Sequence, residues 1–169
     1  MRNILTVLLA SGALLGAAGS ASAANPATTT FTVTANVLKN CTVSAAALTF
    51  NYTPGTGAAT NSSNITVNCT KNTSFTTALT AGTTTGTSIA QRLLNDGAAG
   101  DTLQYNLYTT SGLTTVWGTT VGTNTVAGTG AGMGTAVTQT VYGQVVDSAA
   151  NQAVPPGTYT DTITVNVAY

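Results

Sequence analysis

Apolar and polar residues alternate with a period of two in several short stretches of the chain, and helical periodicity is almost absent. In residues 31–37, Phe31, Val33, Ala35 and Val37 alternate with threonine and asparagine. Further alternating runs follow at residues 65–69, 75–79, 103–107, 141–145 and 163–169. Because successive side chains of a strand point to opposite faces, each run predicts a β-strand with one apolar face.

Turn-forming residues separate these runs. The clusters are Pro54-Gly55, Asp96-Gly97, Ser111-Gly112 and Pro155-Pro156-Gly157. A Gly/Thr-rich stretch at residues 118–134 predicts a long loop or an edge hairpin, and it lacks both the P-loop lysine and the dinucleotide fingerprint. Short strands at this spacing predict an all-β sandwich or barrel.

The N-terminus has the pattern of a signal peptide. Arg2 precedes an apolar run at residues 4–18, and Ala21-Ser22-Ala23 fits the small-x-small pattern of a cleavage site. We expect cleavage after Ala23, so that residues 24–169 form an exported, single-domain mature chain. An uncleaved N-terminal anchor is the alternative.

Composition excludes some partners and indicates a β-rich surface. Beyond residue 23, the chain has three basic residues, Lys39, Lys71 and Arg92, and four aspartates. This charge balance gives no cationic surface that could bind nucleic acid or anionic lipid. The chain has 38 threonines, a β-branched residue that favours strands and keeps a surface hydrated without charge. Copies of a chain with such a surface repel one another only weakly.

The two cysteines, Cys41 and Cys69, predict a structural disulfide in an exported protein. The chain has no histidine, and a zinc site would need two further ligands. We therefore expect neither a metal nor another cofactor.

No catalytic residues are predicted. Serine and threonine are abundant, but a nucleophile needs a neighbouring base, and histidine, the usual base, is missing. Asp96 lies in a predicted turn and Asp161 begins the last predicted strand, which are ordinary places for aspartate.

Six segments, in order, resemble the spore coat protein U family, which includes the Csu-type pilins of archaic chaperone–usher systems. They are TTTFTVTANVLKNCTVSA (28–45), ITVNCT (65–70), DTLQYNLYT (101–109), TTVWGTT (114–120), TVYGQV (140–145) and PPGTYTDTITVNVAY (155–169). Each segment is a weak signal, but their order and the cysteine spacing together are specific.

The resemblance implies an incomplete immunoglobulin-like β-sandwich that is completed by a donor strand from a neighbouring subunit. A periplasmic chaperone first lends a strand, and an outer-membrane usher then exchanges it for the N-terminal extension of the next subunit. The implied product is a cell-surface fibre built from copies of this chain or related pilins, exported through the periplasm. Strand addition of this kind takes affinity from main-chain hydrogen bonds and specificity from side-chain pockets.

The extension meets the requirements of a donor strand. It alternates over residues 28–38, and Pro26 lies outside this stretch. We expect Phe31, Val33, Ala35 and Val37 to be the residues inserted into the neighbour. Residues 24–39 then form the extension and residues 40–169 the domain, whose acceptor groove is lined in part by Ile163, Val165 and Val167. Pairing of residues 31–37 within their own domain, and plain core packing of the last strand, are the alternatives.

Three functions compete on the sequence alone. A structural pilus subunit supporting attachment and biofilm growth is favoured. A minor or tip adhesin usually carries an additional binding domain and needs no donor strand. A spore or cell-surface coat protein would share the fold.

Overall fold

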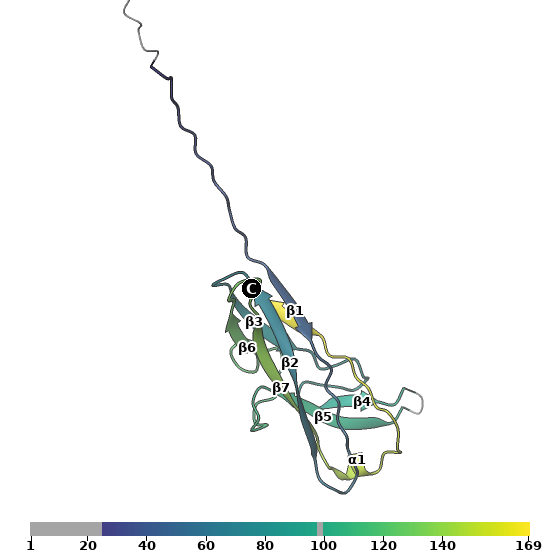
Figure 1. Ribbon diagram of the computed structural model, residues 1–169. Helices are drawn as coiled ribbons and strands as arrows, with labels where there is room; N and C mark the ends of the chain where they lie inside the picture. Colours follow the sequence, from purple (N-terminus) through teal and green to yellow (C-terminus); the bar gives the residue numbers. More distant parts are fainter. Residues whose placement is uncertain (1–24, 98–99) are drawn as a thin grey trace, which may run out of the picture. The chain divides into compact units, whose positions relative to one another are not determined.

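The computed structural model describes residues 25–97 and 100–169 (Figure 1). The predicted signal peptide, residues 1–23, lies outside the described residues. Two structural units are distinguished, with the boundary between Ala35 and Asn36. Residues 25–40 contain no helix or strand, and all helices and strands of the described chain lie beyond them.

The domain is built almost entirely of antiparallel strands, which confirms the predicted all-β class. The elements are β1 (Cys41–Ala45), β2 (Ala59–Cys69), β3 (Ser74–Leu79), β4 (Arg92–Asn95), β5 (Thr102–Tyr108), β6 (Val126–Thr129), β7 (Val137–Val145), α1 (Ala149–Gln152) and β8 (Val165–Ala168).

The strands form two sheets, and non-consecutive strands lie side by side in both. The larger sheet has the order β1-β2-β7-β5-β4, and the smaller has the order β6-β3-β8. The longest pairing joins β2 and β7, from Ala59 opposite Val145 to Val67 opposite Val137. Strands β1 and β8 are therefore edge strands of different sheets, and Figure 1 shows them at the same side of the domain.

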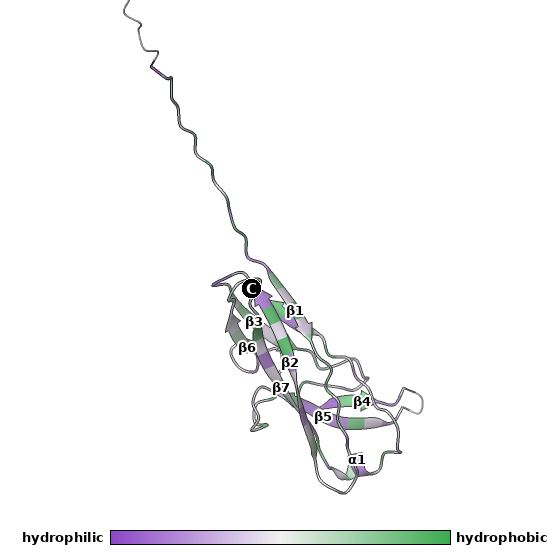
Figure 2. Ribbon diagram, viewed as in Figure 1, coloured by the Kyte–Doolittle hydropathy of each residue, from purple (hydrophilic) through white to green (hydrophobic). Residues whose placement is uncertain are grey.

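A single apolar core lies between the sheets, which makes the domain a β-sandwich. The larger sheet contributes the alternating residues of β2, β5 and β7, and the smaller contributes Phe75 and Leu79. Trp117 is fully buried, and its indole N–H donates to the backbone oxygen of Thr77 at 3.0 Å. The green positions along β2 in Figure 2 mark this apolar face.

Most alternating runs of the sequence form strands, but their lengths differ from those predicted. β3, β5 and β7 include the predicted runs, and β2 begins six residues earlier than predicted. The last strand is shorter than the predicted run 163–169, since β8 spans Val165–Ala168. The stretch 118–134 contains one short edge strand, β6, between loops. It forms no hairpin, because β6 pairs with β3, which lies far from it in the sequence.

Residues 31–37 are the one alternating run that forms no strand. Phe31 is 86% exposed and Val37 is 88% exposed. Alternation supplies an apolar face but no pairing partner, and a strand needs both.

Candidate functional site: a groove between two sheet edges

The first wall of the candidate site is the edge of the larger sheet. In β1, Cys41, Val43 and Ala45 lie opposite Cys69, Val67 and Ile65 of β2 and therefore share their core-facing side. Val67 is fully buried, but Val43 is 43% exposed. An apolar side chain on the inner face of a sandwich is thus incompletely covered.

The second wall is the segment that leads into β8. From Asp161 to Val167, the odd-numbered residues are half-buried and the even-numbered residues are exposed, so the segment is extended with its odd side chains inward. Val165 lies opposite Leu79 of β3, and Val167 lies opposite Thr77.

The outer backbone edge of this segment is unpaired in the described chain. The Thr80 N–H donates to the backbone oxygen of Thr164 at 3.1 Å, so Thr164 turns its peptide groups toward β3. Alternate residues of an antiparallel strand direct these groups to opposite sides. Ile163, Val165 and Val167 therefore direct their peptide groups to the other side, away from β3. On that side, no strand of the described chain pairs with β8.

A groove of about 220 Å³ lies between the two walls. On the first wall, Ala45 at the end of β1 and the residues that follow it line the groove, and on the second wall Asp161, Ile163 and Val165 do so. The residues beneath are core residues of both sheets, namely Ile65, Leu79, Tyr105, Leu107 and Val141. The hydrophobic core is thus accessible along a line that one further strand could cover.

Leu48 and Phe50 close the groove toward β7. A Cβ atom at Gly143 would lie 2.5 Å from Phe50 Cζ and 2.6 Å from Leu48 Cδ2. Only glycine at this position of β7 lets both side chains reach the core, where the Phe50 ring packs against Tyr105 with centroids 6.3 Å apart.

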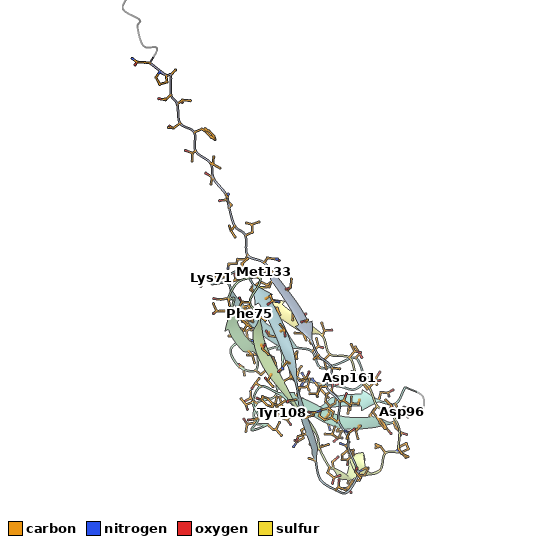
Figure 3. The ribbon with its side chains drawn as sticks, in the orientation of Figure 1. Lys71, Phe75, Asp96, Tyr108, Met133 and Asp161 are labelled. Carbon is orange, nitrogen blue, oxygen red and sulfur yellow. A yellow bond between two sulfur atoms is a disulfide. The ribbon has the colours of Figure 1, made fainter. Side chains whose placement is uncertain are left out.

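Asp161 is the charged residue of the groove lining. One carboxylate oxygen accepts the backbone N–H groups of Thr83 and Thr162, both at 2.8 Å, and the other accepts the Tyr105 hydroxyl at 2.7 Å. Burial and this hydrogen bond raise the pKa of Tyr105 well above its usual range, so its hydroxyl remains a donor. The carboxylate is therefore fixed in place, and Figure 3 labels its position.

A buried arginine supports the strands below the groove. Arg92 of β4 is completely buried, and its guanidinium donates to the backbone oxygens of Thr80 (2.8 Å) and Trp117 (2.6 Å) and to Asn106 Oδ1 (2.6 Å). Burial lowers the pKa of this guanidinium. These carbonyl acceptors compensate in part for desolvation of the charge.

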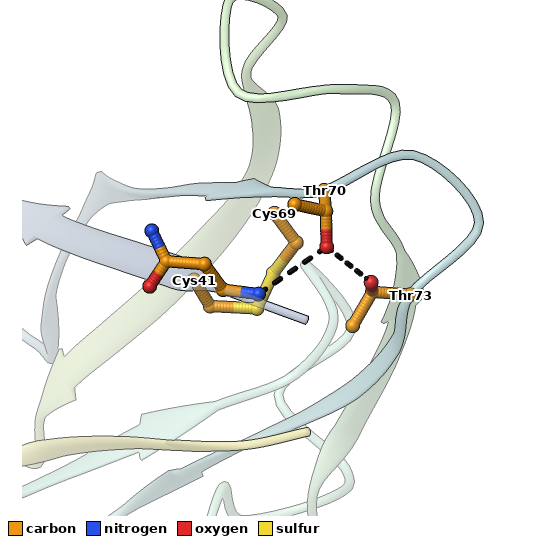
Figure 4. Close-up of a disulfide and its surroundings, with 5 residues drawn as sticks. Cys41, Cys69, Thr70 and Thr73 are labelled. Carbon is orange, nitrogen blue, oxygen red and sulfur yellow. Dashed lines mark hydrogen bonds between the residues drawn. A yellow bond between two sulfur atoms is a disulfide. The ribbon is translucent and has the colours of Figure 1, made fainter. Parts of the chain in front are cut away.

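The predicted disulfide is present and lies where the extension joins the domain. Cys41 and Cys69 are directly paired residues of β1 and β2, with Cα atoms 4.1 Å apart. Next to it, the Asn40 N–H donates to Thr70 Oγ1 at 3.3 Å, and Thr70 Oγ1 lies 2.7 Å from Thr73 Oγ1 (Figure 4). The chain is therefore anchored at the point where the domain begins.

The structure brings two of the three predicted acceptor residues to the groove. Ile163 and Val165 line it, whereas Val167 lies farther along β8 and is half-buried outside the lining. Their role as acceptors stays a prediction, as does the role of the exposed residues Phe31, Val33, Ala35 and Val37.

Sequence reasoning did not assign Leu48, Phe50, Tyr105 or Asp161 to the groove. For Asp161 a signal existed, because it continues the odd-numbered face of the last strand. Leu48 and Phe50 follow β1 and belong to no strand. Their packing over Gly143 is a tertiary contact, which the alternation of apolar and polar residues does not predict.

The described residues offer neither a metal site nor a membrane helix. Within residues 25–97 and 100–169, no three histidine, cysteine, aspartate or glutamate side chains gather. In the same ranges, no helix has the length and apolar content needed to cross a bilayer.

Comparison with solved structures supports the sandwich fold. The chain is similar to a chain of the crystal structure of the CsuC–CsuE chaperone–tip adhesion subunit pre-assembly complex from archaic chaperone–usher Csu pili of Acinetobacter baumannii. The TM-score is 0.56 at 22% sequence identity, over 79% of this chain and 40% of that chain. This chain thus matches less than half the length of its structural relative.

Comparison with curated protein sequences finds no match. A family model does match, over residues 27–166, and its description is Spore Coat Protein U domain. The match includes both walls of the groove and most of the extension. The chain belongs to the Spore Coat Protein U domain family.

Proposed function

We propose that this protein is a structural subunit of a surface pilus, assembled by the chaperone–usher pathway through donor-strand exchange, and that it is not an enzyme. One observation carries the proposal. The same chain has an apolar groove with an unpaired strand edge and an exposed, alternating segment of the kind that fills such a groove.

The extension supplies what the groove lacks. Phe31, Val33, Ala35 and Val37 form an apolar face, while Val43 of β1, on the first wall, is incompletely covered. Burying Phe31, Val33 and Val37 is worth about 5–8 kcal/mol before the cost of ordering the segment. Each ladder hydrogen bond adds about 0.5–1.5 kcal/mol.

The donor comes from another copy in this proposal. Residues 24–39 form the donor segment, and residues 40–169 form the domain that accepts the segment of the next copy. A chain that donates at one end and accepts along its side gives an open head-to-tail polymer.

The remaining partners follow from family membership and the likeness to the Csu complex. A periplasmic chaperone would cover the groove until assembly, because an unpaired strand edge beside exposed core residues invites aggregation. An outer-membrane usher would exchange the strands, and the product would be an extracellular fibre that supports attachment.

Thermal melting of a chain lacking residues 24–38 tests the proposal. We expect a low melting temperature that rises by about 10 °C or more with a peptide of residues 28–40, since a ΔΔG of 1 kcal/mol shifts the midpoint by about 2–8 °C. A Phe31→Asp peptide should fail, while a Thr32→Asp peptide, changed on the other face, should retain most of the effect.

The opposite outcome is equally informative. A truncated chain that is monomeric, melts cooperatively at high temperature and does not respond to the peptide would contradict strand donation. The domain would then be self-sufficient.

A further inference from the structure

This inference rests on the proposed function. We propose that the extension of the next copy enters the groove antiparallel to residues 161–169 in one register, fixed by an ion pair between its Lys39 and Asp161. Ala35 then lies opposite Val165, and Val37 lies opposite Ile163.

The direction follows from where each chain must continue. The extension leaves its own domain at Cys41, the end of β1 that is tied to Cys69, and Figure 1 places the C-terminus at this same end. Figure 3, in the orientation of Figure 1, shows Asp161 farther along the domain from that end. It lines the groove together with Leu94 and Tyr105. A donor antiparallel to β8 exits at the Asp161 end, so its domain stays clear of the recipient's own extension. A parallel donor would bring both to one end.

The faces and the backbone edges also agree. Odd-numbered residues of the extension are apolar, and odd-numbered residues from 161 to 167 point inward and have their peptide groups at the free edge. Any pairing of odd with odd residues therefore gives both ladder hydrogen bonds and an apolar interface.

Charge selects one of these pairings. Lys39 is the single charged residue of the extension, and it lies on the same face as Val37. Asp161 is the single charged residue among those that line the described groove. A shift of two residues in one direction places the Lys39 ammonium against Ile163, and the opposite shift places Val37 against Asp161. Both leave a charge beside apolar side chains, which is costly.

The other positions fit the same register. Phe31 lies opposite Tyr169, which is 54% exposed, and aromatic cross-strand pairs are favourable. On the outer face, Asn36 lies opposite Thr164 and Thr34 opposite Asn166, which are polar pairs at exposed positions.

Asp161 is prepared for this role by its own hydrogen bonds. Thr83, Thr162 and the Tyr105 hydroxyl hold the carboxylate at a fixed point on the wall, so a cation meets an ordered acceptor. A partly exposed ion pair contributes little affinity but discriminates between registers.

Cysteine cross-linking of the mature chain tests the register. Three full mature chains each carry Ala35→Cys together with Ile163→Cys, Val165→Cys or Val167→Cys, so that the extension of one copy can form a disulfide with the groove of the next. We expect an efficient disulfide with Val165→Cys alone, because directly paired Cα atoms are about 5.5 Å apart and diagonal neighbours about 7–8 Å. Preferential cross-linking at residue 163 or 167 would overturn the register while leaving strand donation intact. Absence of a cross-link at all three positions would overturn the proposed function as well.

Peptide affinities test the ion pair. A Lys39→Met peptide should bind the unmodified mature chain about three- to tenfold more weakly than the unmodified peptide, and the loss should shrink at high salt. The Asp161→Asn chain should bind both peptides equally, while an Asp101→Asn control, which removes a carboxylate outside the groove lining, should preserve the difference. An equal loss on the Asp161→Asn chain would show that Lys39 acts elsewhere and would overturn the proposal.

Discussion

Two segments of this chain have the same pattern of apolar and polar residues but opposite environments. In β2, Ile65, Val67 and Cys69 alternate with polar residues and are buried. In the extension, Phe31, Val33 and Val37 alternate in the same way and are more than four-fifths exposed. β2 has β1 on one side and β7 on the other, and residues 31–37 belong to no sheet. Alternation therefore tells which face is apolar, whereas the topology decides whether that face is already covered.

Replacing a valine by aspartate should have the most different effects on stability in the two segments. Val67→Asp places a carboxylate in the core, and we expect loss of about 4–5 kcal/mol or more, enough to prevent folding. Val33→Asp should leave the free energy of unfolding of the domain unchanged when the residues 28–40 peptide is supplied. Urea unfolding of both variants with that peptide makes the comparison. An equally large loss in Val33→Asp would mean that the extension belongs to its own domain.

The next largest effect concerns the junction between the two regions. Replacing both cysteines by serine opens a loop with a sequence separation of 28 residues, which should cost about 3–4 kcal/mol. Urea unfolding of the double variant and of the oxidised parent measures this difference. A matching loss in the reduced parent would assign the effect to the bond, and a negligible loss in both would show that β1 is held by its ladder alone.

A smaller effect should distinguish the groove from the open surface. Gly143→Ala forces Phe50 and Leu48 from their positions, and we expect a loss of about 1–3 kcal/mol. Gly134→Ala is the matched control, because a Cβ atom there meets nothing within 4 Å. Thermal melting of both variants, and their affinity for the donor peptide, should show a defect only for Gly143→Ala. A neutral result for Gly143→Ala would mean that the groove wall can shift freely.

The smallest effect is expected at a partly buried hydrogen-bonded pair outside the groove lining, formed by Tyr52 and Asp147. Asp147 accepts the Tyr52 hydroxyl at 2.5 Å and the N–H groups of Gly55 (3.0 Å) and Gly57 (2.8 Å), which lower its pKa from 3.8 to about 2. A carboxyl with a lowered folded-state pKa stabilises the fold above about pH 4, and this contribution is lost as the pH falls through 2.

Thermal midpoints at pH 7, 4 and 2 measure that contribution. The parent should lose more stability between pH 4 and pH 2 than Asp147→Asn does, and Tyr52→Phe should give an intermediate loss because it removes the principal donor. Identical pH profiles for the parent and Asp147→Asn would show that the hydrogen-bonded pair has no energetic role.

Much of the fold could be predicted because several strands have one buried face. The alternating residues of β3, β5 and β7 show that face directly in the sequence. β4 was missed because its sequence, RLLN, does not alternate and begins with the buried Arg92. α1 has four residues, too few for helical periodicity, and its signal is the Ser148 hydroxyl that accepts the Asn151 N–H.

The groove itself was only partly predictable, since it is made by residues distant in the sequence. Ile163 and Val165 could be named because they alternate. Phe50 could not, because its contact with Gly143 joins positions more than ninety residues apart. The place of Asp161 likewise depends on Thr83 and Tyr105, neither of which lies near it in the sequence.

In the proposed fibre, the position of the disulfide has a mechanical consequence under tension. A pull on the extension passes through the hydrogen-bonded Asn40 to Cys41, the first residue of an edge strand whose ladder pairs only with β2. Without a covalent tie, the five residues of β1 could be peeled away one hydrogen bond at a time. The bond to Cys69 instead transfers the load to β2, which is eleven residues long and pairs with β7 over most of its length. Reduction should therefore lower the rupture force of the fibre even where every donor strand remains in its groove.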